Sequence, residues 1–235
     1  MSIATPSLRG FDGFGHAPMN TLTKLALGLM GQLKPTAVPE SPAIVLPAPR
    51  LTGGMALMEA LQRRASSREF DETALDLATL SEVLWAAGGV NRPDVGGRTA
   101  PSAMNSQEVE LHLALPHGLF RYEPLTHTLQ LTVARDVRRV TGYQDFVDTA
   151  PLDLIFVANH TQMKLVPAAQ RERYAYAAAG AMSQNVYLYC AANALATVIR
   201  AWFDPRALSQ AMGLESDQQL LLCQTVGRVK AVAVH

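Results

Sequence analysis

The chain has 235 residues, of which 49% are hydrophobic and 17% charged, and these values favour one domain with a sizeable core. Its 20 basic and 20 acidic residues cancel, which argues against nucleic acid or an anionic membrane as a partner and favours a small molecule. The two cysteines, Cys190 and Cys223, lack Cys-x-x-Cys spacing and stand in apolar segments. We therefore expect buried, reduced thiols rather than a disulfide or a zinc site.

Residues 1–50 are predicted to form an extended arm ahead of a single domain at residues 51–235. Five prolines occur between residues 31 and 50, which is typical of an extended segment. The apolar run at residues 25–30 is too short for a signal peptide and has no clean cleavage site. We expect a cytoplasmic protein, with an atypical export signal at residues 19–40 as the alternative.

Two helices are predicted at the start of the domain. A short amphipathic helix at residues 55–64 carries three apolar side chains on one face, Leu57, Met58 and Leu61. Thr79 and Glu82 form a capping-box pattern at the start of a second helix, which Gly88 and Gly89 end.

Strand patterns dominate the middle of the chain. From Glu108 the sequence alternates, with apolar residues on one face and Glu108, Glu110 and His112 on the other, which predicts a half-exposed strand. Two short strands at residues 119–122 and 129–133, a short helix at 134–141 and a central strand at 152–158 are expected next.

Residues 174–199 contain no charged side chain, and a stretch of this length could span a membrane. Alanine contributes little hydrophobicity, and several amide and hydroxyl side chains in this stretch need partners that lipid does not offer. We therefore expect no membrane span, but a buried central helix of a large core or of a dimer interface. Asp204 and Pro205 predict the start of another helix, Gly213 its end, and residues 220–226 a final buried strand. The strand order cannot be read from these patterns.

Two polar segments are candidate binding sites. Residues 63–70 carry three arginines and two serines at a helix end, a set that matches phosphate oxygens, although a solvated basic helix end has the same composition. Residues 98–107 gather amides, hydroxyls and a proline without acidic side chains. They suit the edge of a flat polar ligand, or an ordinary Pro-Ser turn. Rossmann, P-loop and nucleophile-elbow motifs do not occur. The six histidines are scattered and form no His-Glu-x-x-His motif, so we expect no protein-ligated metal.

Taken together, these segments resemble the FMN-dependent nitroreductase family. Arg-Ala-Ser-Ser-Arg-Glu-Phe at residues 64–70 is followed some thirty residues later by Pro-Ser-Ala-Met-Asn-Ser-Gln at residues 101–107. Later segments follow in the family's order: Gln184-Asn185, residues 194–204, Met212-Gly213-Leu214 and Thr225-Val226-Gly227. The resemblance covers roughly residues 55–230, and residues 91–93 and 142–146 look like a bacterial branch of the family.

The resemblance implies an α+β fold with a central antiparallel or mixed sheet flanked by helices. It further implies an intertwined homodimer that buries two FMN molecules at its interface. The implied activity is an oxidoreductase that takes hydride from NADH or NADPH and passes it to a small acceptor, such as a nitroaromatic or a quinone. Because the flavin supplies the chemistry, we expect no catalytic acid or base among the side chains.

The resemblance also assigns individual flavin contacts. The phosphate and ribityl end falls to Arg64 and Ser66, with Arg63 beside them and with Arg228 and Lys230 added from the end of the chain. Arg68 is placed near the pyrimidine side of the ring, where a cation stabilises the charge that develops on reduction. The contacts from the other chain are Pro101, Ser102, Ala103 and Asn105, and the remaining ring contacts are Gln144, Ala201 and Trp202.

Two departures from the family pattern matter. Many members have an acidic residue followed by glycine beside flavin N5, whereas this chain has Ala201 and Trp202, whose indole either narrows the pocket or packs in the core. Ala65 replaces a polar or basic residue and weakens one phosphate contact. Two other functions remain open: a flavin-dependent dehydrogenase or oxidase acting on a peptide or small metabolite, and a flavin-binding protein without turnover.

Overall fold

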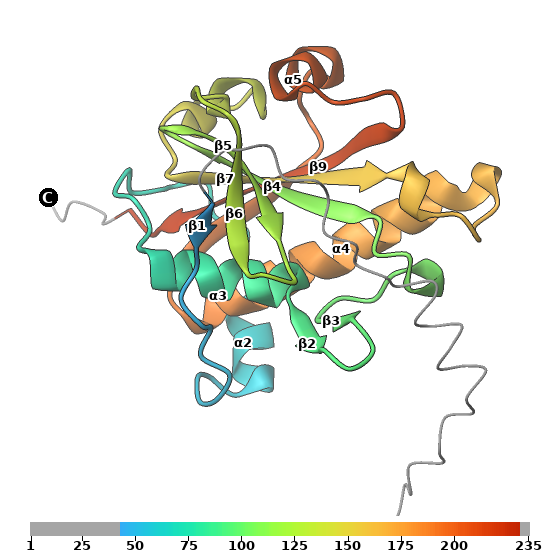
Figure 1. The fold of residues 1–235 in the computed structure, drawn as a ribbon. Helices are drawn as coiled ribbons and strands as arrows, with labels where there is room; N and C mark the ends of the chain where they lie inside the picture. Colours follow the sequence, from blue (N-terminus) through green and yellow to red (C-terminus); the bar gives the residue numbers. More distant parts are fainter. Residues whose placement is uncertain (1–42, 231–235) are drawn as a thin grey trace, which may run out of the picture.

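The computed structural model describes residues 43–230, which form an α+β fold around an antiparallel sheet (Figure 1). The sheet order in this part of the chain is β1-β6-β5-β4-β7-β9-β8, and every pairing in it is antiparallel. Its strands are β1 (Ile44–Val45), β4 (Val109–Leu115), β5 (Gly118–Glu123), β6 (Thr128–Val133), β7 (Leu152–Asn159), β8 (Leu195–Arg200) and β9 (Gln218–Arg228). A separate hairpin pairs β2 (Val90–Arg92) with β3 (Gly97–Arg98). The expected α+β class with a central antiparallel sheet is confirmed.

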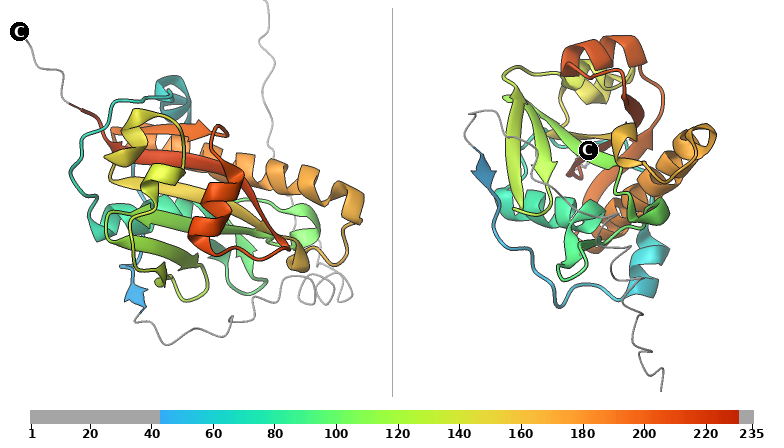
Figure 2. Two further views of the ribbon diagram at one scale, coloured as in Figure 1. Left: turned by 90° about the horizontal axis from the view of Figure 1, so that it is seen from above. Right: turned by 45° about the vertical axis from the view of Figure 1, so that its right-hand side comes forward.

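Helices cover both faces of this sheet. The described helices are α2 (Leu57–Arg63), α3 (Leu77–Gly88), α4 (Ala168–Ala192) and α5 (Pro205–Met212). α3 and α4 lie on one face, and α5 lies on the other (Figures 1 and 2). β7 supplies both cores, because Phe156 packs toward α3 and α4 while Ile155 packs toward α5. A strand covered on both sides needs apolar residues at nearly every position, which explains the apolar run that predicted it. Its one charged residue, Asp153, is buried in an ion pair with Arg200.

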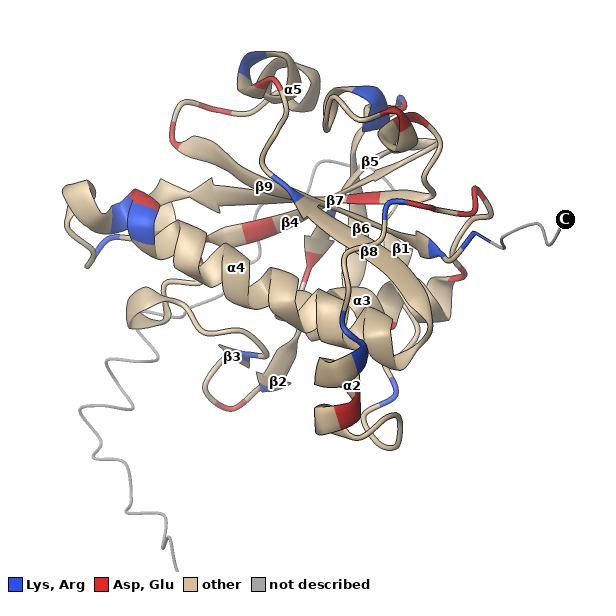
Figure 3. Cartoon of the chain, turned by 180° about the vertical axis from the view of Figure 1, so that it is seen from behind, with Lys and Arg blue, Asp and Glu red and all other residues tan. Residues whose placement is uncertain are grey.

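The long uncharged segment forms a helix and a strand, so the prediction of one helix through Ile199 was wrong. α4 ends at Ala192, where the Asn193 side chain donates to the Tyr189 carbonyl at 2.9 Å and Ala194 takes a left-handed φ of 53°. The β-branched residues that follow favour the strand β8. The uncharged length of α4 is visible in Figure 3. No helix in residues 43–230 is long and apolar enough to cross a membrane.

The N-terminus of α3 lies three residues earlier than the capping-box pattern predicted. Asp76 is the N-cap, and its carboxylate accepts from the Thr79 backbone N–H at 2.8 Å and from the Thr79 hydroxyl at 3.0 Å. An aspartate and a threonine are both good caps, and the chain uses the first of them. The backbone hydrogen bond from Thr79 is the main cause that holds the pKa of Asp76 below its ordinary value of 3.8.

Asp76→Ala is expected to lower the free energy of unfolding by about 1 kcal/mol at neutral pH, the usual cost of an N-cap. Because the folded-state pKa of Asp76 is depressed, this contribution is present above pH 3.8 and is lost as the pH falls through the folded value. Urea unfolding of the two proteins at neutral and at acidic pH measures the difference. A difference in unfolding free energy between the two proteins that stays constant on acidification would contradict the assignment of the cap to the ionised carboxylate.

β4 is not half-exposed, as its alternating pattern predicted. Glu108 and His112 are buried, because β4 lies between β5 and β7 and both faces of the sheet are covered there. The carboxylate of Glu110 accepts from the Asn159 amide at 2.9 Å and from the Gln218 amide at 3.2 Å. Polar residues on this face are therefore buried rather than hydrated, with Glu110 paired and both ring nitrogens of His112 left without a hydrogen bond among the described residues. A pattern of polar residues does not distinguish burial from hydration.

Two further local predictions differ from the structure. Residues 134–141 do not form a helix; only Arg138–Val140 makes a short 3-10 turn, because the Asp136 carboxylate captures the Arg138 backbone N–H at 3.0 Å. In α2 the predicted apolar face is exposed, with Met58 at 75% and Leu57 at 63% exposure. Only Ala60 of this helix is buried.

Several other predictions agree closely with the structure. The strands β5, β6 and β9 occupy the predicted segments, and Asp204 caps α5, which Gly213 ends at a φ of 69°. Residues 1–42 of the expected arm lie outside the described residues. The segment that follows them packs on the domain, since β1 pairs with β6 and Leu46 is buried.

Candidate functional site

The basic segment after α2 is tied to one end of the sheet. The Ser67 backbone N–H donates to the Thr197 carbonyl of β8 at 3.0 Å, and Phe70 pairs with Val229 just beyond β9. The Asp71 backbone N–H donates to the Arg228 carbonyl at 3.0 Å. These backbone contacts bring four predicted phosphate-site residues to the same end of the domain: Arg64, Ser66, Arg228 and Lys230.

Tyr187 of α4 holds the start of this segment. Its hydroxyl lies 2.8 Å from the Ser66 Oγ and accepts from the Ile199 backbone N–H at 3.0 Å. With that N–H as donor, the phenolic proton of Tyr187 is free to point to Ser66, and the Ser66 proton is then available to a ligand. The Arg64 guanidinium lies over the Tyr187 ring, 5.3 Å from its centroid. Tyr187 was not predicted from the sequence, where its only signal is a phenol in the uncharged part of this helix.

The arginines of the segment differ in how many donors they keep free. Arg63 pairs with Glu59 at 2.6 Å, and Arg228 lies 3.3 Å from the Asp76 carboxylate. Among the described residues, Arg64 and Arg68 make no ion pair and donate no side-chain hydrogen bond. Their guanidinium groups are therefore the ones that can still bind an anion without losing a protein partner.

The 101–107 segment has an unusual backbone. Met104, Asn105 and Gln107 have φ values of 53°, 52° and 51°, a left-handed conformation that non-glycine residues adopt at an energetic cost. The Ser102 Oγ accepts from the Gln107 backbone N–H at 2.9 Å, and the Gln107 amide donates to the Asn105 side chain at 3.1 Å. Three strained residues held by side-chain bonds are more than an ordinary Pro-Ser turn needs, and such strain clusters at binding sites.

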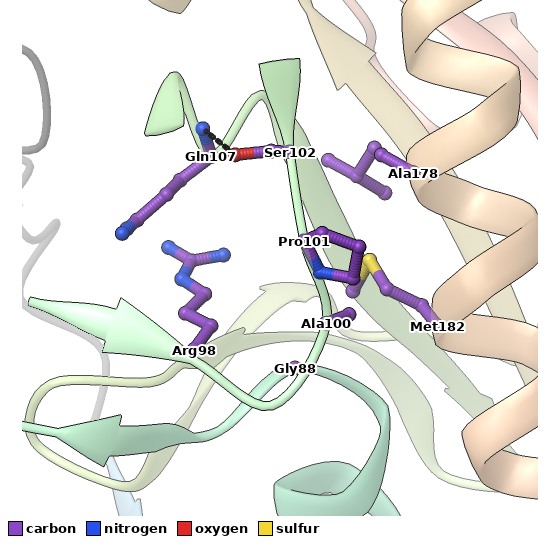
Figure 4. A pocket seen from close by; sticks show the side chains of 9 residues that line it. Gly88, Arg98, Ala100, Pro101, Ser102, Gln107, Ala178 and Met182 are labelled. Carbon is purple, nitrogen blue, oxygen red and sulfur yellow. Dashed lines mark hydrogen bonds between the residues drawn. The ribbon is translucent and has the colours of Figure 1, made fainter. Parts of the chain in front are cut away.

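This segment lines a pocket between the β2–β3 hairpin and α4 (Figure 4). The lining residues are Gly88, Arg98, Ala100, Pro101, Ser102, Gln107, Val109, Ala178 and Met182. Ala103 and Asn105 stand in the 3-10 turn that follows Ser102. Within the described part of one chain, no hydrogen bond or ion pair joins residues 101–105 to residues 64–68.

A buried ion pair fixes the loops that carry the remaining predicted ring contacts. The Arg200 guanidinium donates to the Asp153 carboxylate at 2.5 Å, to the Thr141 carbonyl at 2.6 Å and to the Thr225 hydroxyl at 2.8 Å. Burial raises the pKa of Asp153, and the charge of Arg200 opposes that shift. Since Arg200 precedes Ala201 and Thr141 lies three residues before Gln144, this network joins the two loops. It was not predicted from the sequence.

Trp202 lies on the surface of the chain, so its predicted alternative role in the core is wrong. Its side chain is 65% exposed, and its ring centroid lies 5.2 Å from that of Tyr143, which is also exposed. Gln144 has a buried Oε1 atom without a partner in the part of the chain that the structure describes. Cys190 and Cys223 are free and buried as expected, and burial raises the pKa of both thiols.

Comparisons with known proteins place this chain among nitroreductases. The family model described as the nitroreductase family matches residues 61–228. An inferred nitroreductase of Methanocaldococcus jannaschii is 31% identical over 159 residues, which cover 63% of this chain and 80% of that protein.

Solved structures show the same fold. An inferred nitroreductase of Ralstonia eutropha JMP134 has a TM-score of 0.78 and 51% identity, covering 83% of this chain and 94% of the other. An inferred nitroreductase of Anabaena variabilis has a TM-score of 0.69 at 19% identity, covering 82% of this chain and 42% of the other, and this likeness concerns the fold alone. With a family match over more than two thirds of its length, the chain belongs to the nitroreductase family.

Proposed function

We propose that this protein is an FMN-dependent oxidoreductase that takes hydride from NADH or NADPH and passes it to a small acceptor, such as a nitroaromatic or a quinone. The observation that carries the proposal is the anion site at residues 64–68. There Arg64 and Ser66 are positioned by Tyr187, and Arg64 and Arg68 keep their donors free. Family membership supports the oxidoreductase class.

The residues at this end fit the phosphate and ribityl chain of FMN. A guanidinium offers a planar set of donors that matches phosphate oxygens, and the Ser66 hydroxyl can donate to a further oxygen. Arg228 and Lys230, whose backbones lie beside residues 69–71, add positive charge from the end of β9. Arg63 contributes less, because Glu59 already neutralises it.

Other residues would orient the ring. Arg68 would face its pyrimidine side, where a cation favours the negative charge of the reduced ring, and the backbone at Ala201 and Trp202 would lie beside N5. When bound, FMN supplies the hydride transfer, while the protein binds, orients and excludes water. The exposed Trp202 and Tyr143 rings favour planar acceptors over a blocked pocket.

The second half of the site comes, in this proposal, from a partner subunit. Residues 101–105 make no bond to residues 64–68 of the same chain, and their strained conformation suits a ligand held elsewhere. The exposed apolar side chains of α2, Leu57 and Met58, and of the 101–107 segment, Met104, offer surface for such an interface. A homodimer with FMN at the interface satisfies both observations.

The purified protein is expected to be a yellow dimer whose flavin absorbance bleaches when NADH or NADPH is added without oxygen. Acid extraction and chromatography identify the flavin, and sedimentation measures the oligomeric state. A colourless protein that also fails to bind added FMN would rule out the proposal. A flavin that binds but is not bleached by either nicotinamide would favour a dehydrogenase that takes hydride from another metabolite.

A further inference from the structure

Arg98, at the end of β3, is a half-buried cation that has no acidic partner among the described residues. Figure 4 shows its guanidinium pointing into the pocket beside Gln107 and Ser102. Its Nε is buried and makes no hydrogen bond, and the side chain forms no ion pair with any residue of 43–230. Burial lowers the pKa of Arg98 to about 10, so the side chain remains a cation at neutral pH. Taking part of a charged group out of water without a hydrogen bond in return is costly, which makes the retention of Arg98 informative.

The carboxylates near Arg98 accept from other donors, although the buried Oε1 of Glu108 has no partner among the described residues. Glu108, Glu110 and Glu123 raise the pKa of Arg98 through space, but none lies close enough for an ion pair. Glu108 accepts from the Ser106 hydroxyl at 2.7 Å, Glu110 accepts from two side-chain amides, and Glu123 pairs with Arg121 at 2.6 Å. These acids favour the charged form of Arg98 without using its donors.

The rest of the pocket favours a small anionic group attached to an apolar body. Ser102 uses its Oγ as the acceptor from the Gln107 N–H, so its own proton can be donated to a ligand. Val109, Ala178 and Met182 make an apolar wall beside these donors. The pocket is a shallow hollow with little enclosed space, much smaller than a site that holds a whole ligand. It is therefore suited to one group of a larger molecule.

We propose that Arg98 and Ser102 form a subsite that binds the carboxylate of the acceptor substrate. A planar guanidinium can bind both oxygens of a carboxylate, and the hydroxyl can donate to one of them. The subsite includes Ser102 of the segment 101–105, which the proposed function places against the flavin, so the assignment to the acceptor rests on that function. The substrate class is then a planar acceptor that carries a carboxylate, not a neutral nitroaromatic or quinone.

The test compares 4-nitrobenzoate with the neutral, similarly shaped 4-nitrobenzamide in steady-state reduction by the holoprotein. The wild type is expected to favour the carboxylate in kcat/KM by about tenfold or more, the effect of one charge-assisted contact. Arg98→Gln is expected to remove the preference, and Arg98→Lys to keep part of it, because it retains the charge but loses the fork. Equal kcat/KM values for the two compounds in the wild type would overturn the proposal.

Calorimetric titration with benzoate provides a readout that does not depend on turnover. Benzoate is expected to bind the wild type and not Arg98→Gln, even if the protein proves to have no reductase activity, so the subsite and the proposed function can fail separately. Arg173→Gln is the matched control, because Arg173 is an exposed cation on α4 that does not line the pocket. It is expected to change neither the preference nor benzoate binding.

Two results would reject the subsite. Benzoate binding that survives Arg98→Gln would place the anion elsewhere. If Arg98→Gln becomes monomeric in sedimentation but still prefers 4-nitrobenzoate to 4-nitrobenzamide, Arg98 pairs with a carboxylate of the partner subunit instead of binding the substrate. If Arg98→Gln does not fold, as judged by circular dichroism, Arg98→Lys decides the question through its reduced benzoate affinity.

Discussion

Arg64→Ala is expected to weaken FMN binding by roughly 10- to 150-fold, which corresponds to the loss of one hydrogen bond to a charged group, about 1.5–3 kcal/mol. The Arg64 guanidinium lies 5.3 Å from the centre of the Tyr187 ring and has no carboxylate partner among the described residues. It is therefore already positioned for an anion, and binding breaks no existing ion pair. Quenching of FMN fluorescence by the apoprotein measures the dissociation constant.

Two companion variants separate phosphate binding from general effects. Arg206→Ala removes an exposed charge from the start of α5 and is expected to leave the FMN dissociation constant unchanged. Tyr187→Phe keeps the ring beneath Arg64 but removes the hydroxyl that contacts Ser66 and Ile199, so a smaller loss of affinity is expected. Unchanged FMN affinity in Arg64→Ala would mean that the segment is a solvated basic helix end.

The features that could be predicted from the sequence are those that local chemistry determines. Residues 152–158 indicate a central strand because a strand covered on both faces must be apolar at nearly every position, and β7 is such a strand apart from Asp153. The start and end of α5 follow from Asp204, Pro205 and Gly213, whose caps need no distant partner. The family resemblance likewise depended on short motifs in a fixed order, and residues 61–228 match the family.

Other features depend on contacts between segments far apart in the chain. The boundary between α4 and β8 lies in an uncharged stretch whose periodicity does not change clearly, and it is set by the Asn193 side chain and the left-handed Ala194. Tyr187 becomes important only because Ser66 and Ile199 meet at its hydroxyl. The sequence alone could not have indicated this meeting point.

The lack of a partner is also a property of the folded chain. Arg98 stands in a sequence with three acidic residues within 25 positions on its C-terminal side, Glu108, Glu110 and Glu123. All three lie near it in the fold, yet each accepts from another donor and none forms an ion pair with Arg98. A count of charges therefore predicts pairing where the geometry leaves a cation free. The carboxylate subsite follows from that difference.

Arg200→Leu is expected to lower the free energy of unfolding by about 3–5 kcal/mol, because it leaves the Asp153 carboxylate buried without its cation. Asp153 has no exposed surface, and its remaining partners are the hydroxyls of Thr141 and Thr225. Urea unfolding of the apoprotein measures the change without a contribution from bound flavin. The loops that carry Gln144 and Trp202 should loosen together, since Arg200 joins them through the Thr141 carbonyl.

The double variant Asp153→Leu, Arg200→Leu shows whether the loss comes from the unpaired charge. With both charges removed, desolvation no longer opposes folding, so the double variant is expected to be more stable than Arg200→Leu alone. Recovery should be incomplete, because the hydroxyls of Thr141 and Thr225 would lose the carboxylate that accepts from them. If the double variant were less stable than the single one by the full cost of a second core substitution, packing around Arg200 rather than its charge would hold the two loops together.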